Sequence, residues 1–580
     1  MALLGIIQAS DSVIKLALFL AISTSLAFVI QRIFFHSLSK FPGPWINAIS
    51  PLPEVLAIVA GRQHAYHRRL HEKYGPVVRV SPNELIFCGA DAWDDIYGNK
   101  PGKPDFEKSP LQAGGLPQHI PARALTLAPW NDHVRQRKAW AYGFSNTALL
   151  GQEPLIKAHI DKLIASLHRL ASKAGEVKAV DMAAWLTYTT FDIIGELCFA
   201  EPFGCLDSGE AGEWSTSIVN IANAGMYDQA MRRLTGLGTW LTAFLVRNLT
   251  PKKYTAWRQA HFLKSKEKTM RRLADKDREH KDFIYYVLRN NEAKALLSEL
   301  EIVMNTALFT AAGSDTTATM LAAWTNLMLR NRDKYKKLVD EVRRTFRSAS
   351  EISWTTVKDL PYLNAVNQEV LRICAPVPTN LCRVVPPGGA VIDGHPVPGG
   401  TTVSLSPWAA THLPLNFSRP LDFLPERWLY YSSNSSSDSS NSFHSPTVSG
   451  SKSSTTPPPG NEFSTDKPHA SQPFSHGPRG CIGKNLTNIE QRLIMAHLVW
   501  HFDFEVPDDE GSKEQLKENE KWDPRGDMKG LKAWLVWQKP SLWVRLRVVD
   551  REGSEREREG GGDWTMRDRF VAEGVVNGEY

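Results

Sequence analysis

The chain has 580 residues, of which 42% are hydrophobic and 10% aromatic, a composition ample for a large buried core. Its formal net charge of +6 is mild for this length, and no Lys/Arg-rich run suggests a nucleic-acid footprint, which argues against a nucleic-acid partner. The six cysteines are scattered without C-x-x-C pairs, which excludes a dense disulfide framework and indicates a reducing compartment.

The first predicted element is an apolar stretch over residues 13–35. About 20 apolar residues cross a bilayer, and this stretch reaches that length if Lys15 extends toward one interface. A cleaved signal peptide is the alternative, but a single basic residue precedes the apolar run and no A-x-A-type site follows. Because Arg32, His36 and Lys40 gather at the C-terminal flank of the stretch, the positive-inside rule predicts a short lumenal segment over 1–12 and a cytosolic main body.

Mixed elements follow the anchor. The spacing predicts a helix over 54–74 that ends at Gly75, and then two short strands over 77–80 and 84–87. The region from 100 to 129 is rich in proline and glycine and is predicted to be a long loop. Long loops inside compact domains are often functional, so we expect this one to lie near a site.

The next helix is predicted from Trp130 toward Ala148 and carries His133 and Arg137 four residues apart. Side chains with this spacing share one face, so the two basic groups can meet the same anion. A solvated basic face is the alternative, because this spacing alone is weak evidence. Further helical spacing over 155–170, 180–199, 215–230 and 252–276 carries no assignable chemistry.

An unusually long helical pattern runs from Glu299 to Arg330, with Ala-Gly-Ser-Asp-Thr-Thr over 312–317 in its middle. A glycine inside a helix costs about 1 kcal/mol relative to alanine, so Gly313 needs a reason. A ligand pressed against the helix is the reason we expect. The alternative is a structural one, in which a threonine bonds to its own helix and the aspartate is exposed.

Two motifs beyond this helix carry charges. Glu369 and Arg372 form E-x-x-R on a helical stretch over 362–372, one turn apart, so they can pair. Alone, this pattern is usually a surface pair. Arg427 follows within Pro-Glu-Arg-Trp, and the segment over 390–406 between the two motifs is predicted to be a β-hairpin.

The stretch over 474–483 reads F-x-x-G-x-R-x-C-x-G and precedes a helical pattern over 485–502. A cysteine at the start of a helix lies near free backbone N–H groups and the positive end of the helix dipole, which favour the thiolate. Cys481 is therefore placed to be an anionic ligand. A structural cysteine in a Gly/Pro turn is the alternative, and the five fixed positions met in register argue against it.

The other fixed positions of the loop fit a ligand site. Gly477 and Gly483 let the backbone turn sharply and approach a flat cofactor, Arg479 can meet a carboxylate, and Phe474 can shield the sulfur from water. The loop resembles the haem-binding loop of the cytochrome P-450 family, with every fixed position matched.

The resemblance covers residues 41–547, because A-G-x-D-T-T, E-x-x-R and P-E-R-W also occur in family order. It implies a mainly α fold with small β-sheets, preceded by one N-terminal transmembrane helix, as in membrane-anchored members from filamentous fungi. The stretch over 376–385 resembles the strand that borders the substrate pocket, and the segment over 205–250 resembles part of its roof.

The resemblance also implies roles for residues. Cys481 is the axial ligand of the iron of haem b, and the helix breaks locally near Asp315 and Thr316, which relay protons during oxygen activation. The implied cofactor-binding residues are Phe474, Gly477, Arg479, Cys481, Gly483, His133, Arg137 and Arg383. Relatives commonly carry tryptophan where His133 stands. Glu369, Arg372 and Arg427 form a network behind the haem loop.

Two segments are predicted to be unstructured. Ser, Pro, Asn and Thr dominate residues 432–472, a composition that cannot bury enough apolar surface to offset ordering, and we expect a disordered insertion. The segment over 548–580 is charged and rich in glycine, and we expect a disordered tail.

Together these features predict a haem-thiolate monooxygenase that inserts one oxygen atom of O₂ into an apolar small molecule. The fungal resemblance suggests hydroxylation of a terpenoid or polyketide intermediate, including mycotoxin precursors. No dinucleotide or flavin fingerprint is evident, so electrons are expected from a membrane-bound NADPH-cytochrome P-450 reductase, with a cytochrome b-type protein as a further candidate donor. The expected location is the endoplasmic reticulum membrane, as a single-pass protein in contact with lipid.

Two other functions remain open. A haem-thiolate isomerase or dehydratase needs no external electrons, and the intact pair of Asp315 and Thr316 argues against it. A non-catalytic haem-binding or sensor protein is the second. The substrate and the position of attack are not readable from the sequence.

Overall fold

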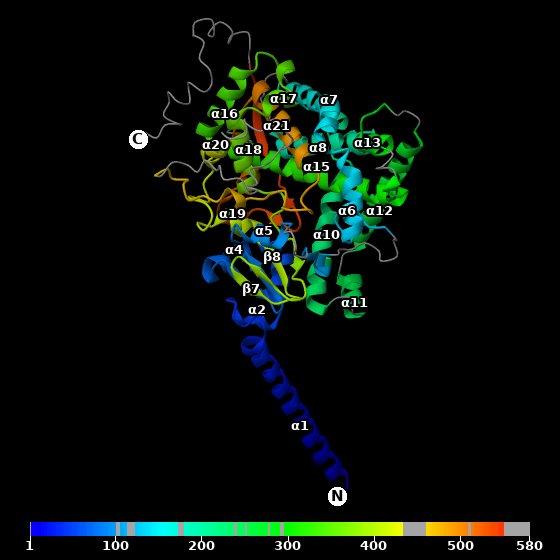
Figure 1. Ribbon diagram of the computed structural model, residues 1–580, viewed down its shortest axis with the longest axis vertical. Coiled ribbons are helices and arrows are strands. Elements are labelled where there is room, and N and C mark those ends of the chain that lie inside the picture. Colours follow the sequence, from blue (N-terminus) through cyan, green and yellow to red (C-terminus); the bar gives the residue numbers. More distant parts are fainter. Residues whose placement is uncertain are drawn as a thin grey trace.

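A computed structural model of the chain describes residues 2–99, 105–112, 122–171, 179–236, 240–249, 252–275, 279–290, 295–432, 460–507 and 512–549. It confirms the predicted fold class, a mainly helical domain with small β-sheets and one N-terminal helix that projects away from it (Figure 1). The predicted tail beyond Val549 lies outside the described residues.

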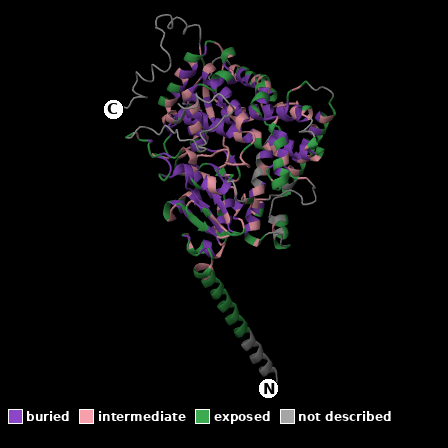
Figure 2. Cartoon of the chain, viewed as in Figure 1, coloured by how far each residue is buried: buried purple, intermediate pink, exposed green. Residues whose placement is uncertain are grey.

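The projecting helix is a candidate membrane anchor. Helix α1 (Ala2–Ile30) continues into the π-helical turn η1 (Gln31–Phe35), so the predicted lumenal segment belongs to the same helix. Residues Ile14–Phe35 are long and apolar enough to cross a bilayer, and none of that window is buried against the domain. Figure 2 shows this helix exposed while the interior of the domain is buried.

The domain is built mainly from helices of very different lengths. In chain order they are α2 (Trp45–Ile49), α3 (Leu52–Val59), α4 (Gln63–Tyr74), α5 (Ala92–Tyr97), η2 (Pro110–Gln112), α6 (Trp130–Ala141), α7 (Asn146–Ala171), α8 (Met182–Phe199), α9 (Cys205–Ser208), α10 (Glu213–Thr235), α11 (Trp240–Leu249), α12 (Lys252–Ala274), α13 (Phe283–Arg289), α15 (Glu299–Arg330), α16 (Arg332–Thr345), η3 (Ala349–Glu351), α17 (Trp354–Val357), α18 (Pro361–Ile373), α19 (Pro407–His412), α20 (Glu426–Ser432), η5 (Pro468–Ala470), α21 (Lys484–His501), α22 (Lys513–Glu520) and α23 (Arg525–Met528).

The helix predicted over 54–74 is two helices instead of one. Gly61 adopts φ +68°, a left-handed conformation that ends α3, and α4 begins at Gln63. The carbonyl of Gly61 accepts a hydrogen bond from the backbone N–H of Ala533, so the break connects this region to the C-terminal part of the chain. The pattern from Trp130 to Ala148 is likewise divided between α6 and α7.

The largest sheet has the strand order β1-β2-β8-β5-β3. Its strands are β1 (Val77–Ser81), β2 (Glu84–Phe87), β3 (Glu107–Lys108), β5 (Arg383–Val384) and β8 (Thr402–Leu405). The smaller sheets contain β4 (Val180–Asp181), β6 (Ala390–Ile392), β7 (His395–Val397), β9 (Phe502–Glu505), β10 (Lys532–Ala533), β11 (Trp537–Gln538) and β12 (Trp543–Val548). The predicted hairpin is β6–β7, whereas β8 leaves it to pair in parallel with β2. The antiparallel pairing of β3 with β5 sets Lys108 opposite Arg383.

Helix α15 is the centre of the core and has the predicted bounds. A capping box of Ser298 and Glu301 closes its N-terminus, and it stays helical through residues 312–317 without a break. A Cβ on Gly313 would lie 2.8 Å from Cδ1 of Ile194 on α8. The close approach of Ile194 is therefore one reason for glycine here, and Gly313 also lines the cavity where a ligand is expected.

The predicted insertion over 432–472 needs correction at its C-terminal end. Residues 433–459 lie outside the described part of the chain, but residues 460–472 pack into the fold. Phe463 and Asp466 are 3% and 8% exposed. This stretch is ordered because Asp466 finds a buried cationic partner, a contact that composition alone does not reveal.

Candidate active site

A cavity of about 1760 Å³ lies between α15, the loop before α21 and the helices α10 and α12. It brings together most of the side chains that the sequence singled out. Those that line it are His133, Arg137, Asp315, Thr316, Phe474, Arg479, Cys481 and Gly483. Gly477 and Arg383 lie outside the lining, although both contact residues next to it.

The loop that presents Cys481 is closed by its own backbone. The N–H of Cys481 donates to the carbonyl of Phe474 at 2.8 Å, and the N–H of Gly480 donates to the carbonyl of Gly477 at 2.9 Å. Gly477 adopts φ +72°, and a Cβ there would lie 1.9 Å from the carbonyl oxygen of Tyr97. Gly477 therefore fixes the loop against α5, whereas the nearest atom to a Cβ on Gly483 is the sulfur of Cys481 at 3.9 Å.

The pKa of the Cys481 thiol lies above its ordinary value, so the protein surroundings alone do not favour the thiolate. Burial raises the pKa of its thiol, and the backbone N–H groups of Gly483 and Lys484 and the cation of Arg137 oppose that rise. The helix terminus therefore stabilises the thiolate only in part. A bound metal ion deprotonates a coordinating thiol outright, so the sulfur fits an axial ligand of haem iron.

Basic side chains gather at one end of the cavity, and we call them the cation cluster: Lys108, His133, Arg137, Arg383 and Arg479. Arg137 donates to the carbonyl of Gly480 at 2.7 Å, and Arg479 donates to the carbonyl of Ala128 at 3.2 Å. His133 is 3% exposed, and its Nδ1 has no hydrogen-bond partner among the described residues.

Among the residues that the structure describes, the cation cluster is short of negative charge. Burial and then the neighbours Arg383 and Arg479 lower the pKa of Lys108 to about 7. Burial and the surrounding cations lower the pKa of His133 to about 4. Asp105 and Glu107 raise the pKa of Arg479, but burial and Arg383 outweigh them.

Like charges that are partly withdrawn from water are stabilised by anions beside them. The cation cluster and Cys481 are thus complementary to a flat metal complex that carries carboxylates, which fits haem with its propionates. Sequence reasoning found four members of the cluster and missed Lys108, because the stretch around it has no motif.

Asp315 and Thr316 lie on the part of α15 that lines the cavity. The hydroxyl of Thr316 donates to the carbonyl of Ala312 at 2.7 Å. Asp315 is not exposed, because its carboxylate accepts a hydrogen bond from Nζ of Lys539, and the two side chains are 3% and 9% exposed. The same Nζ lies 3.2 Å from Oγ1 of Thr319. Sequence reasoning missed Lys539, which follows β11 and is adjacent to α15 only in the fold.

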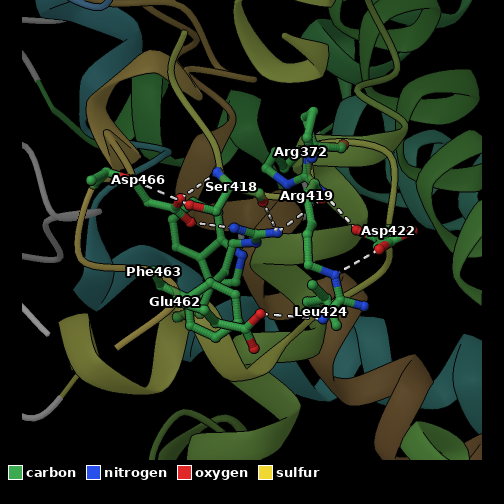
Figure 3. Close-up of polar contacts among 12 residues, drawn as sticks. Arg372, Ser418, Arg419, Asp422, Leu424, Glu462, Phe463 and Asp466 are labelled. Atoms are coloured by element: carbon green, nitrogen blue, oxygen red, sulfur yellow. Dashed lines mark hydrogen bonds and ion pairs between the residues drawn. The ribbon is translucent and has the colours of Figure 1, made fainter. Parts of the chain in front are cut away.

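Glu369, Arg372 and Arg427 meet behind the loop. Oε1 of Glu369 lies 2.8 Å from Nη2 of Arg372 and 3.2 Å from Nε of Arg427, and all three side chains are buried. Burial opposes ionisation of Glu369, but the two guanidinium groups hold its pKa below the ordinary value. The side chain of Asp466, fully buried, pairs with Nη1 of Arg427 and also accepts from the N–H of Ser418 (Figure 3).

We call these four side chains, Glu369, Arg372, Arg427 and Asp466, the buried network. Arg372 also donates to the carbonyls of Thr411 at 2.8 Å and Pro420 at 2.7 Å. Through Asp466 the network holds the segment that leads to Phe474. Its charges balance, so it is a structural support for the loop rather than a ligand site.

Known proteins are similar to this chain over nearly all of its length. The sequence profile of the cytochrome P-450 family matches residues 42–522. The cytochrome P-450 monooxygenase aba2 of Botryotinia fuckeliana is 49% identical over 91% of this chain and 93% of its own length. ABA2 of Pyricularia oryzae is 45% identical over 90% and 94%, and the averantin hydroxylase of Dothistroma septosporum is 35% identical over 91% and 90%.

Proposed function

Because the chain belongs to the cytochrome P-450 family, we propose that it hydroxylates an apolar small molecule in the secondary metabolism of a filamentous fungus. The chain is a monooxygenase whose cofactor is haem with a cysteine thiolate ligand, and its electrons come from NADPH through a reductase. The observation that carries the proposal is the thiol of Cys481 in the wall of a large cavity that Asp315 and Thr316 also line.

Bound haem supplies the redox chemistry, because a thiolate ligand favours cleavage of the O–O bond of dioxygen. The chain itself holds the cofactor and excludes water. Cys481 would provide the ligand, the cation cluster would bind the propionates, and the buried network keeps the loop in place. The remaining wall of the cavity is mostly apolar, which favours an apolar substrate.

Proton movement is assigned to Thr316 and Asp315. The hydroxyl of Thr316 now donates to Ala312, and rotation about χ1 would direct the same hydrogen into the cavity. Asp315 precedes Thr316 on the same turn of α15, and its carboxylate is paired with Lys539. We assign it the role of a relay that accepts a proton from solvent and passes it to the Thr316 hydroxyl. General acid–base assistance of this kind is worth about 10²–10⁴-fold.

This assignment predicts that Thr316→Ala keeps substrate binding but lowers the product formed per NADPH consumed, with hydrogen peroxide released instead. Thr316→Ser retains the hydroxyl and should retain much of the yield. Unchanged yield in Thr316→Ala would assign the proton route to water or to Thr317.

The cellular setting forms part of the proposal. Helix α1 anchors the protein once in the endoplasmic reticulum membrane, and the basic residues Arg32 and Lys40 after it place the catalytic domain in the cytosol. The partners in this arrangement are a membrane-bound NADPH-cytochrome P-450 reductase and, as a second donor, a cytochrome b-type protein. Membrane lipid concentrates the apolar substrate.

Turnover in ¹⁸O₂ tests the function. Metabolite profiling of a strain that lacks the protein identifies the compound that accumulates, and that compound is incubated with the holoprotein, reductase and NADPH. A monooxygenase places one ¹⁸O atom in the product and one in water. Product without ¹⁸O and without NADPH consumption would indicate an isomerase or dehydratase, and no product at all would indicate a haem-binding sensor.

A further inference from the structure

A buried acid lines the cavity on the side of α21. The wall there is formed by Gly483, Leu486, Thr487, Glu490 and Gln491, whose spacing of three to four residues places them on one face of the helix. Helices α15 and α21 pack against each other at the centre of the domain (Figure 1). Glu490 is 2% exposed, so its carboxyl group is withdrawn from bulk water where these two helices meet.

The surroundings of Glu490 favour the neutral form of its carboxyl group. Burial raises its pKa to about 8, and the hydroxyl of Thr317 opposes the rise. No charged side chain among the described residues contributes to this shift. At neutral pH the group is therefore mostly an acid with an O–H to donate. Asp315 differs, because Lys539 pairs with its carboxylate.

Thr317 differs from the other hydroxyl residues of α15. Those others each donate to a backbone carbonyl of their own helix, and they are Thr306, Thr310, Ser314, Thr316, Thr319 and Thr325. The hydroxyl of Thr317 is buried and has no hydrogen-bond partner of ordinary geometry among the described residues. It nevertheless lies close enough to Glu490 to act on its pKa. Because buried polar groups are normally hydrogen-bonded, a small rotation that pairs Thr317 with Glu490 is favoured.

We propose that Glu490 is a second proton donor for the reaction, positioned by Thr317 and independent of the pair of Asp315 and Thr316. The O–H of Glu490 gives its proton to water in the cavity and leaves a carboxylate. The hydroxyl of Thr317 donates a hydrogen bond to that carboxylate until a proton from solvent restores the acid. One proton is lost and one is regained, and no electron moves in this step. The inference rests on the proposed function, because it supplies protons to the same reaction.

Infrared difference spectroscopy tests the protonation state of Glu490 without turnover. The spectrum of the haem-loaded wild-type protein minus that of Glu490→Gln at pH 7 should contain the C=O stretching band of a protonated carboxylic acid. Thr317→Val should shift that band, because it removes the hydroxyl beside the acid, whereas Thr317→Ser should leave it in place. A difference spectrum with carboxylate bands alone would overturn the proposal, since an ionised Glu490 has no proton to give. An unshifted band in Thr317→Val would contradict the role of Thr317.

The product formed per NADPH consumed tests whether the second route is independent. It is measured for the wild type, Glu490→Gln, Thr316→Ala and the double variant. Glutamine has the shape of the neutral acid but gives up no proton at neutral pH, so a purely structural role would survive the change. Two parallel routes compensate for each other, so the loss in the double variant should exceed the product of the two single losses by about tenfold. A combined loss no larger than that product would contradict an independent route.

Two further variants in the Thr316→Ala background serve as controls. Glu490→Asp keeps an acid and should retain most of the remaining yield, and a loss as large as that of Glu490→Gln would contradict the proposal. Glu341→Gln is the matched control and should leave the yield unchanged. Glu341 of α16 is also a buried acid, with its pKa raised to about 7 by burial, but it accepts from the backbone N–H groups of Tyr362 and Leu363 and does not line the cavity.

The carbon monoxide spectrum of each preparation reports separately on haem ligation. Absence of the thiolate band in the wild-type protein would count against the proposed function. Its loss in Glu490→Gln alone would make Glu490 a structural support and contradict its role as a proton donor.

Discussion

Two groups of charged side chains lie near the loop of Cys481, and they differ in how their charge is balanced. In the buried network, Glu369 and Asp466 meet Arg372 and Arg427 in direct ion pairs. In the cation cluster, burial and neighbouring cations lower the pKa values of Lys108 and His133. A balanced buried cluster serves the fold, whereas an unbalanced one needs a ligand. Mutations in the two groups should therefore have different consequences.

The largest expected effect is in the buried network. Arg427→Ala leaves the carboxylates of Glu369 and Asp466 short of a buried partner, and breaking such a pair costs about 3–5 kcal/mol. The variant should yield little haem-loaded protein, as measured by absorbance per unit of purified chain.

Arg419→Ala is the control for this mutation, because Arg419 is 54% exposed and pairs with Asp422 and Glu462 at the surface. It should cost less than about 1 kcal/mol and leave the haem content unchanged. A normal haem content in Arg427→Ala would mean that the network does not support the loop.

The pair of Asp315 and Lys539 is intermediate between the two groups, because it is balanced but lies beside the cavity. Lys539→Met should destabilise the protein by about 1–3 kcal/mol, less than Arg427→Ala, since water in the cavity can reach Asp315. It should also lower the product formed per NADPH, as Thr316→Ala does. Lys539→Arg, which keeps the cation, should restore much of the yield. A variant with lower stability but full yield would limit Lys539 to a structural role.

A mutation in the cation cluster should change the stability of the haem-free protein in the opposite direction from a mutation in the buried network. Arg383→Met removes one buried like charge, so the haem-free protein should become slightly more stable to urea. Retention of haem should fall at least about tenfold, because a charge-assisted contact to a propionate is lost. Competition with apomyoglobin measures the retention. A loss of stability without a loss of haem would place Arg383 with the buried network.

Much of this organisation could be predicted from local patterns, and the remainder depended on tertiary contacts. The loop of Cys481 and the bounds of α15 follow from motif and periodicity. Asp466 lies in a stretch that resembles a disordered insertion, and Lys539 is distant in sequence from Asp315. Such charged residues gain their partners only when the chain folds. Gly313 was noticed for its cost, but its close contact with Ile194 of α8 could not be identified from the sequence.

A further expected effect is a pH dependence that arises from Lys108. Its pKa is about 7 in the folded chain and about 10.4 in an unfolded one, so between these values the unfolded chain binds more protons. The stability of the haem-free protein should therefore rise from pH 7 to pH 9, and Lys108→Met should reduce that rise. Bound haem should reduce it too, because propionates favour the charged amine. Urea unfolding at the two pH values measures the difference.

The central claim is that Cys481 is the thiolate ligand of a haem iron, and the spectrum of the reduced carbon monoxide complex tests it most directly. The wild-type protein should show the red-shifted Soret band that a thiolate ligand produces. Cys481→Ser should lose that band, while Cys88→Ser, which changes a buried cysteine that does not line the cavity, should keep it. An unchanged band in Cys481→Ser would contradict the assignment of the ligand and the function built on it.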